Sequence, residues 1–171
     1  MKFIKTKIDG VYIIEPSLFK DERGYFFETY SQEKYGIPGD VKFIQDNESS
    51  SSKGVMRGLH YQHGEHCQAK LVRVVKGSVI DFGLDIRRDS ETFGRLFWFR
   101  LDEQNKKQLY VPRGFAHGFV VVSETAEFAY KCDEVYHPED EGGLMWNDSA
   151  IGITWPKTDV AVDDSKSEIF Y

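Results

Sequence analysis

The feature of this sequence that most limits its fold is a succession of short segments with the character of β-strands. They are rich in β-branched and aromatic residues, and Gly, Pro, Asp or Ser separates each from the next. No helical period of useful length lies between them, so we expect an all-β domain, either a sandwich, a jelly roll or a small barrel. The predicted strands are 2–8, 11–14, 24–30, 41–47, 54–62, 70–77, 78–87, 94–101, 107–112, 118–122 and 127–136.

Helix is expected only in a few short segments. Residues 31–36 can form one helical turn, and residues 163–170 can begin a terminal helix with Asp163 or Asp164 as its cap. The 171 residues fit a single core, and no repeat or linker divides them. We therefore predict one domain that spans residues 1–171.

The overall charge and the N-terminus argue against several functional classes. The formal net charge is −6, whereas nucleic-acid and membrane surfaces attract basic proteins. The first residues lack the apolar core of a signal peptide, and no apolar run reaches the length of a membrane span. We expect a cytoplasmic protein with no nucleic-acid or membrane partner, in which Cys67 and Cys132 are free thiols.

The segment 57–70, RGLHYQHGEHCQAK, has the highest density of groups that can transfer protons or bind anions. If its first part is extended, alternation places His60 and Gln62 on one face and the residues between and before them on the other. Gly58 is typical of a β-bulge, which would bring Arg57 round to the side of His60.

Three histidines of this segment suggest a metal site, but their spacing does not suit one. His60, His63 and His66 recur at every third residue, and His117 follows in the turn PRGFAH, which resembles a metal motif of cupins. Ligands on a strand should lie two residues apart, where His60 has Gln62 as its partner. We expect no bound metal and interpret His63 and His66 as solvated loop residues, with a metal-dependent cupin as an alternative.

Several polar residues are embedded within the predicted strands. Each one could lie on a solvated outer face, because charged groups are rarely buried unless they are paired. Together with His60 they could instead line the interior of a barrel, where His and Tyr can accept and donate protons and Lys can stabilise an oxyanion. These residues are Gln45, Asn47, Lys70, Asp81 and Tyr130.

Two arginines have the setting of an anion clamp. Arg23 and Arg57 each precede a glycine, which lets the backbone approach a ligand closely, and two guanidinium groups can bind a diphosphate with paired hydrogen bonds. The alternative is that both form surface ion pairs, Arg23 with Asp21 or Glu22.

These residues belong to longer blocks of sequence that cover roughly residues 11 to 156: DERGYFFETY, FIQDNESSSSKGVMRGLHYQ, QAKLVRVVKGSVIDFGLDIRRDSETFG, QLYVPRGFAHGFVVVSETAEFAYK and GGLMWNDSAIGITWP. In this order they resemble the signature blocks of the dTDP-4-dehydrorhamnose 3,5-epimerases. Several long blocks in the right order are far more specific than any single motif.

The resemblance implies a cupin-type double-stranded β-helix, or jelly roll, that is usually a homodimer and works without a metal or other cofactor on a nucleotide-linked 4-keto-6-deoxyhexose. By position, His60 matches the general base of the family, Tyr130 its general acid, and Lys70 the group beside the ketone oxygen. Further positions match residues that contact the nucleotide sugar: Arg23, Glu28, Gln45, Asn47, Arg57, His117, Glu141 and Lys166. Contact with the base is expected near Phe19, Phe26 and Phe27.

The C-terminal segment departs from the family pattern. The family pairs its catalytic histidine with an aspartate in a Ser-x-Lys-Asp stretch, whereas an ungapped count here places Lys166 on the lysine and Ser167 on the aspartate. Asp164 or Asp163 could take over if the segment shifts, with Asp164 needing the smaller shift. Otherwise another carboxylate or a backbone carbonyl must orient His60.

The resemblance implies a 3,5-epimerase of the dTDP-L-rhamnose pathway, which converts dTDP-4-dehydro-6-deoxy-D-glucose to dTDP-4-dehydro-L-rhamnose. A related epimerase that acts on only C3 or C5, or on another nucleotide sugar, is the first alternative. A sugar-binding cupin without catalysis is the second.

Overall fold

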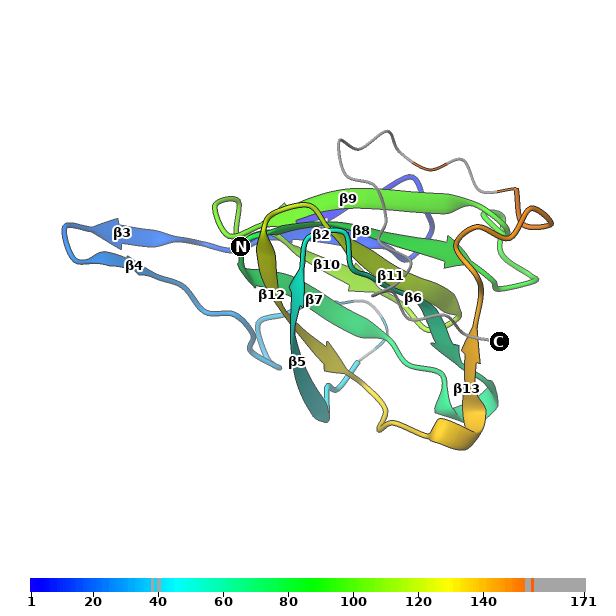
Figure 1. The fold of residues 1–171 in the computed structure, drawn as a ribbon. Helices are drawn as coiled ribbons and strands as arrows, with labels where there is room; N and C mark the ends of the chain where they lie inside the picture. Colours follow the sequence, from blue (N-terminus) through cyan, green and yellow to red (C-terminus); the bar gives the residue numbers. More distant parts are fainter. Residues whose placement is uncertain (38, 40, 153–154, 156–171) are drawn as a thin grey trace.

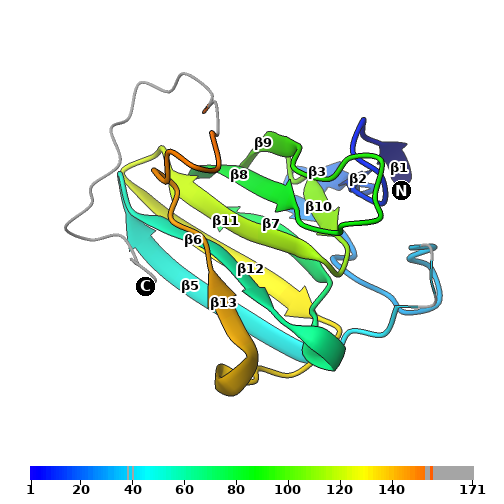
Figure 2. The same ribbon diagram turned by 90° about the vertical axis from the view of Figure 1, so that its right-hand side faces the viewer.

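The computed structural model describes residues 1–37, 39, 41–152 and 155 and shows two facing β-sheets (Figures 1 and 2). The larger sheet has six strands in the order β1-β2-β10-β7-β12-β5, and every pair in it is antiparallel. Its strands are β1 (Lys2–Lys5), β2 (Tyr12–Glu15), β10 (Gln108–Val111), β7 (Lys70–Lys76), β12 (Thr125–Cys132) and β5 (Gln45–Ser52).

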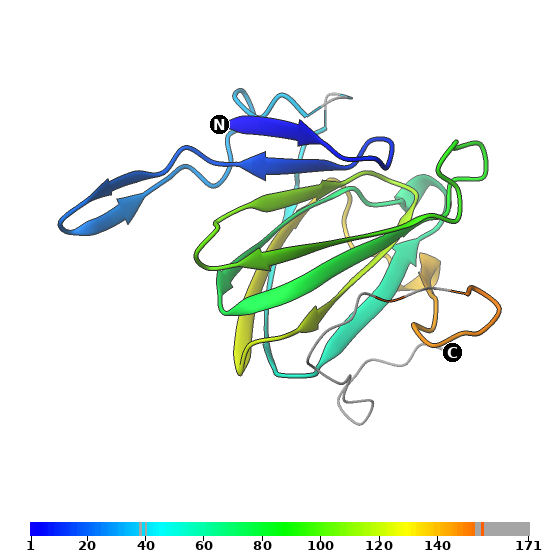
Figure 3. The same cartoon turned by 90° about the horizontal axis from the view of Figure 1, so that it is seen from above.

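The second sheet has five strands in the order β13-β6-β11-β8-β9, also antiparallel. A separate two-stranded hairpin, β3 (Phe19–Asp21) with β4 (Gly24–Phe26), extends away from both sheets (Figures 1 and 3). The five strands are β13 (Glu141–Gly143), β6 (Met56–Gln62), β11 (Phe115–Val121), β8 (Ser78–Asp85) and β9 (Leu96–Asp102).

The predicted all-β jelly roll is therefore confirmed. The helical content of the described residues consists of two 3-10 turns, η1 (Gly64–His66) and η2 (Pro138–Asp140). The segment 31–36 forms a hydrogen-bonded turn, in which the amide of Tyr35 donates to the carbonyl of Ser31 at 2.9 Å. Within the described ranges, no helix has the length and apolar character needed to cross a membrane.

The space between the two sheets is divided between an apolar core and a polar cavity. Alternate residues of the strands point inward, and the apolar ones, among them Val72, Val79 and Leu101, are fully buried. The stacked rings of Phe119 and Phe128, with centroids 4.2 Å apart, belong to this core and also line the cavity. The apolar core therefore adjoins the cavity and forms part of its lining.

Strand β5 corrects the sequence-based boundaries. The predicted strand 41–47 begins only at Gln45, and the serines 49–52 continue it instead of ending it. Its residues alternate between half-buried and exposed, but the inward ones are Gln45, Asn47, Ser49 and Ser51, so no apolar alternation marked them. The prediction was wrong here because this strand contributes polar side chains to the cavity. The short strands β3 and β13 were not predicted either.

The expected bulge in β6 is confirmed. His117 of β11 pairs with His60 and Phe119 pairs with Arg57, so two residues of β6 oppose one residue of β11. Gly58 has φ of +122°, and a Cβ atom on it would lie 2.5 Å from the Cα of Gly118. Only glycine fits this close approach, which turns Arg57 toward the same cavity as His60.

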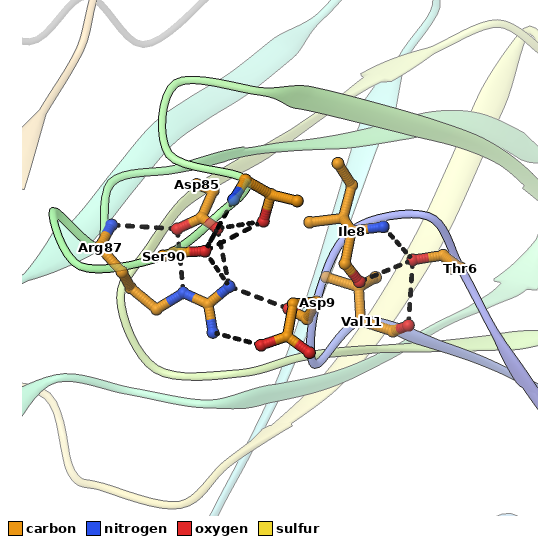
Figure 4. A network of polar contacts seen from close by, with 8 residues as sticks. Thr6, Ile8, Asp9, Val11, Asp85, Arg87 and Ser90 are labelled. Carbon is orange, nitrogen blue, oxygen red and sulfur yellow. Dashed lines mark hydrogen bonds and ion pairs between the residues drawn. The ribbon is translucent and has the colours of Figure 1, made fainter.

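A buried carboxylate holds together the loops at the end of β8 (Figure 4). Asp85 accepts hydrogen bonds from Nε and Nη2 of Arg87 at 2.9 and 2.7 Å, and from the hydroxyls of Ser90 and Thr92 at 2.7 and 2.6 Å. Arg87 also donates to the carbonyl of Asp9 in the turn between β1 and β2 at 2.9 Å. The network thus joins the N-terminal hairpin to the second sheet.

Candidate active site

A cavity between the sheets contains most of the residues selected from the sequence. It has an outer part of about 320 Å³ and an inner part of about 130 Å³. His60, Lys70 and Tyr130 line both parts. His60 comes from β6 of the five-stranded sheet, whereas Lys70 and Tyr130 come from β7 and β12 of the six-stranded sheet. The proposed base and acid therefore project from opposite walls.

The alternation of β6 places His60 and Gln62 in the cavity, as the sequence predicted, and Leu59 in the apolar cluster on the other face of the sheet. Tyr61 packs against that cluster but also borders the outer part of the cavity. On that outer face the cluster continues to Trp146 in the segment after β13. Apolar residues on one face thus fix the strand, and its polar face is directed inward.

Lys70 lies beside the ring of Tyr130, with Nζ 5.8 Å from the ring centroid. Burial lowers the pKa of Lys70, and nearby anionic groups, including Asp81 and Glu141, act in the opposite direction. A lysine in this setting gives a proton to an oxygen more readily than a solvated lysine. It is suited to stabilise an oxyanion in the cavity.

A buried, hydrogen-bonded pair of titratable residues adjoins the inner part of the cavity. Nε2 of His117 is 2.8 Å from Oδ1 of Asp81, and the two residues are 6% and 0% exposed. Burial raises the pKa of Asp81, although His117 and Lys70 oppose this. Among the described residues, Oδ2 of Asp81 and the buried hydroxyl of Ser49 have no hydrogen-bond partner. Such unsatisfied buried groups are typical of functional sites.

Asp81 was expected as a polar residue within a strand but was not among the predicted site residues. The signal was present, because a charged residue in a run as apolar as SVIDFGL must either be paired or lie at a site. Which of the two applies depends on the partner from β11, and that partner is distant in the sequence.

Other predicted substrate contacts also reach the cavity. Gln45, Asn47 and Glu141 line its outer part, and Arg57 and His117 line its inner part. The side-chain amide of Gln45 donates to Oδ1 of Asn47 at 3.1 Å, and Nε of Arg57 donates to the hydroxyl of Ser51 at 3.0 Å. Polar side chains therefore line both the outer and the inner part of the cavity.

Tyr136 is a cavity residue that the sequence analysis missed. It is 51% exposed, lines the outer part of the cavity, and its hydroxyl donates to Oε2 of Glu141 at 2.6 Å. The segment 127–136 was predicted as one strand, but β12 ends at Cys132. Tyr136 therefore lies in a loop, where an aromatic ring can form an edge of the cavity.

Two predicted contacts lie outside the cavity of their own chain. Arg23 and Glu28 belong to the projecting hairpin and the segment after it, and neither lines the cavity. Arg23 is paired with Asp21 at 2.5 Å, as in the alternative interpretation, and Glu28 is paired with Lys34 at 2.8 Å. Both ion pairs are on the surface.

The predictions for the C-terminal segment fall outside the described residues. They concern Lys166 as a substrate contact, Ser167 in place of the family aspartate, and Asp163 or Asp164 as a helix cap or as the partner of His60.

The histidine-rich loop differs from the expectation of solvated side chains. His63 is exposed, but His66 is half-buried and stacks on the ring of His137. Within the ranges that the structure describes, no three His, Cys, Asp or Glu side chains are grouped as metal ligands. Gln62, at the spacing of a second ligand, uses its side-chain amide to bind backbone groups of two loops.

The comparisons with known proteins agree with this architecture. The family model for dTDP-4-dehydrorhamnose 3,5-epimerase matches residues 5–170. The chain belongs to this family. The Salmonella typhimurium dTDP-4-dehydrorhamnose 3,5-epimerase is 53% identical over 158 residues, which cover 91% of this chain and 86% of that protein.

Solved structures of the family superpose closely. The dTDP-4-dehydrorhamnose 3,5-epimerase of Elizabethkingia anophelis has a TM-score of 0.86 and 50% identity, with 97% of this chain and 93% of that chain covered. A Legionella pneumophila dTDP-6-deoxy-D-glucose-3,5-epimerase, in complex with dTDP-4-keto-L-rhamnose, has a TM-score of 0.86 and 44% identity, with coverages of 97% and 91%.

Proposed function

We propose that this epimerase converts dTDP-4-dehydro-6-deoxy-D-glucose to dTDP-4-dehydro-L-rhamnose by moving protons at C3 and C5 of the sugar. The observation that carries the proposal is the position of His60 and Tyr130 on opposite walls of one cavity, with Lys70 of β7 on the same wall as Tyr130. Reduced Cys67 and Cys132 are in keeping with a cytoplasmic enzyme.

The chemistry requires two proton-transfer groups on opposite faces of the ring. The C4 ketone acidifies the protons at C3 and C5, and removal of either gives an enolate. In the proposed mechanism His60 accepts the proton, Lys70 stabilises the negative oxygen, and Tyr130 returns a proton to the other face. A single base that returned the proton to the same face would restore the starting sugar.

The rest of the cavity suits the remainder of the nucleotide sugar. Arg57 and His117 supply donors in the inner part, next to the proposed catalytic residues. Gln45, Asn47 and Glu141 line the wider outer part, toward the exposed Tyr136. We propose that the sugar lies in the inner part and the nucleotide extends outward through the wider one.

We further propose that the active unit is a homodimer in which each hairpin completes the cavity of the other chain. The hairpin projects from the body of the molecule (Figure 1). Phe19 and Phe26, which it carries, are 65% and 70% exposed. Solvent-exposed aromatic rings on an extended arm favour docking against another surface. This arrangement accounts for Arg23 and Glu28, which match substrate contacts but do not line their own cavity.

Deuterium exchange tests the chemistry directly. The protein is incubated with dTDP-4-keto-6-deoxyglucose in deuterated water, and NMR measures deuterium at each carbon. We expect incorporation at both C3 and C5, with loss of both in His60→Ala. In Tyr130→Phe, deuterium exchange should be retained while net epimerisation is lost, because the enolate still forms but is no longer protonated from the other face. Incorporation at one carbon only would identify an epimerase of that carbon, and absence of exchange in the parent protein would contradict the proposal.

Mixing two inactive variants tests the dimer. His60→Ala removes the base and Arg23→Ala removes a group on the hairpin, so a mixed dimer carries both defects in one cavity and none in the other. After co-refolding in equal amounts, activity should return to about a quarter of the parent value, the fraction of intact cavities in a two-fold symmetric dimer. Failure to recover activity from a folded, mixed dimer would place Arg23 in its own chain's cavity or outside the mechanism.

A further inference from the structure

Two short turns at the outer edge of the cavity are locked together by a pair of imidazole rings. His66 ends η1 and His137 precedes η2. The two rings are nearly parallel, with centroids 3.6 Å apart and an interplanar angle of 11°. Both residues are half-buried, so the stacked contact is partly shielded from water. The proposed epimerase chemistry makes no use of either residue.

Each ring is also held by a carboxylate at its Nδ1 atom. His66 lies 2.5 Å from Oδ2 of Asp140, and His137 lies 3.0 Å from Oε1 of Glu139. The hydrogen bond to Asp140 raises the pKa of His66, and the negative charges of Asp140, Glu134 and Glu139 act in the same direction. The hydrogen bond between His66 and Asp140 is a second link between η1 and η2, in addition to the stacked rings.

A buried side chain ties the same two turns to the catalytic strand. Gln62 is 6% exposed, and its Nε2 donates to the carbonyls of His66 at 2.6 Å and Val135 at 3.2 Å. Its Oε1 accepts from the amide of His137 at 2.8 Å. Gln62, His66, His137 and Asp140 therefore form one unit, which we call the clamp.

The clamp holds the residues that form the outer wall of the cavity. Tyr136 lies between Val135 and His137, whose backbone groups Gln62 binds, and Glu141 follows Asp140 directly as the first residue of β13. Tyr136 and Glu141 are hydrogen-bonded to each other, and the amide of Tyr136 donates to Oε1 of Gln45 at 3.0 Å. A shift of η2 relative to η1 would move both wall residues.

We propose that His66 and His137 are positioning residues of this enzyme, which fix Tyr136 and Glu141 so that the cavity is already formed when the nucleotide end of the substrate binds. The inference rests on the proposed function. Because the rings of His66 and His137 hold the outer wall, where the nucleotide end is proposed to bind, their loss weakens binding of the substrate and leaves proton transfer intact. A preformed wall spares the ligand the entropic cost of ordering two loops.

The test compares variants of His66 with a matched control in the same turn. His66→Ala removes both the ring and the donor, and it should raise KM and the Kd of dTDP about tenfold with kcat within about twofold, as for one lost positioning hydrogen bond. His66→Phe keeps the ring and His66→Asn keeps a donor, so each should recover part of the affinity. The control is Glu65→Gln, which alters an exposed side chain of η1 outside the clamp and should match the parent.

The measurements are KM and kcat by deuterium exchange, the Kd of dTDP by calorimetry, and thermal unfolding to establish that each variant is folded. An unchanged KM and Kd in folded His66→Ala, or a fall of kcat alone, would overturn the inference. If His66→Ala does not fold, the KM, kcat and Kd of dTDP measured for His66→Phe and His66→Asn test the inference by the same criteria. Absence of exchange in the parent protein would contradict the proposed function instead, while dTDP binding would still report on the clamp.

Discussion

Asp81 and Asp85 lie on the same strand, β8, and face the same side, yet their surroundings are opposite. Both are completely buried. Asp85 is surrounded by donors from Arg87, Ser90 and Thr92. Asp81 has one partner, His117, and its second carboxylate oxygen has none among the described residues.

The pKa values shift in opposite directions for this reason. Burial by itself would raise the pKa of Asp85, but the hydrogen bonds from Arg87, Thr92 and Ser90 outweigh it and hold that pKa well below its usual range. For Asp81 burial prevails and the pKa is raised. A buried carboxylate that is fully satisfied is structural, whereas one that is left partly unsatisfied beside a cavity marks a site.

The largest expected effect is on stability, in Asp85→Asn. This change leaves the guanidinium of Arg87, only 27% exposed, without its main counter-ion. We expect a loss of about 3 kcal/mol in the free energy of unfolding, with unchanged kcat in the folded fraction. Urea unfolding measures the first and deuterium exchange the second.

The matched control is Asp9→Asn, which alters an 81% exposed partner of the same arginine. It should change stability by less than about 0.5 kcal/mol. If Asp85→Asn is no more harmful than this control, the network of Figure 4 does not hold the loops together as described.

The second effect is on catalysis, in Asp81→Asn. Removing this negative charge should lower the pKa of Lys70 further, so the basic limb of the pH profile of kcat should move to lower pH. Around neutral pH we expect kcat to fall about tenfold, with stability retained or increased. An unchanged pH profile would indicate that Asp81 carries a proton throughout the working range and is electrostatically silent.

The third effect is a difference of sign in the pH dependence of stability. Because the pKa of Asp85 is lowered on folding, its contribution is present above the unfolded pKa of about 3.9 and is lost as the pH falls below it. For Asp81 the pKa is raised, so the favourable contribution is present at low pH and is lost as the pH rises through the folded value.

Unfolding of the parent and the two Asn variants at several pH values between about 3 and 7 measures these contributions. The free energy of unfolding of the parent should exceed that of Asp85→Asn by a smaller margin as the pH falls. Relative to Asp81→Asn, the free energy of unfolding of the parent should decrease as the pH rises. If the stability difference between the parent and each variant changed in the same direction with pH, the assignment of one carboxylate to structure and the other to the site would be contradicted.

The smallest effect concerns a single donor to Asp85. Ser90→Ala removes one hydroxyl bond and leaves Arg87 and Thr92 in place. We expect a loss of about 1 kcal/mol in the free energy of unfolding. Thermal or urea unfolding measures it, and a loss as large as that of Asp85→Asn would mean that the hydroxyl, not the ion pair, is the main stabilising contact.

Much of the fold was predictable because strand and turn preferences are local. The apolar strands β7 and β8 were found within a residue or two of their ends, and the bulge at Gly58 followed from a glycine inside a strand pattern. Strand β5 was not found correctly, because the alternation rule needs an apolar face and this strand presents its polar side chains to the cavity.

The sequence by itself determined that the chain is an all-β member of its family, and it placed His60 and Gln62 on one face of β6. Both conclusions rest on short-range information, a period of two along a strand and blocks of residues in a fixed order.

Only the tertiary structure decided which polar residues meet. The pairing of Asp81 with His117 and the use of Gln62 by two turns each depend on contacts between segments that are not neighbours in the sequence. The alternation of side chains along a strand shows only that the strand has two faces. The sheet that packs against it determines which face becomes the core, which becomes the surface, and which becomes the site.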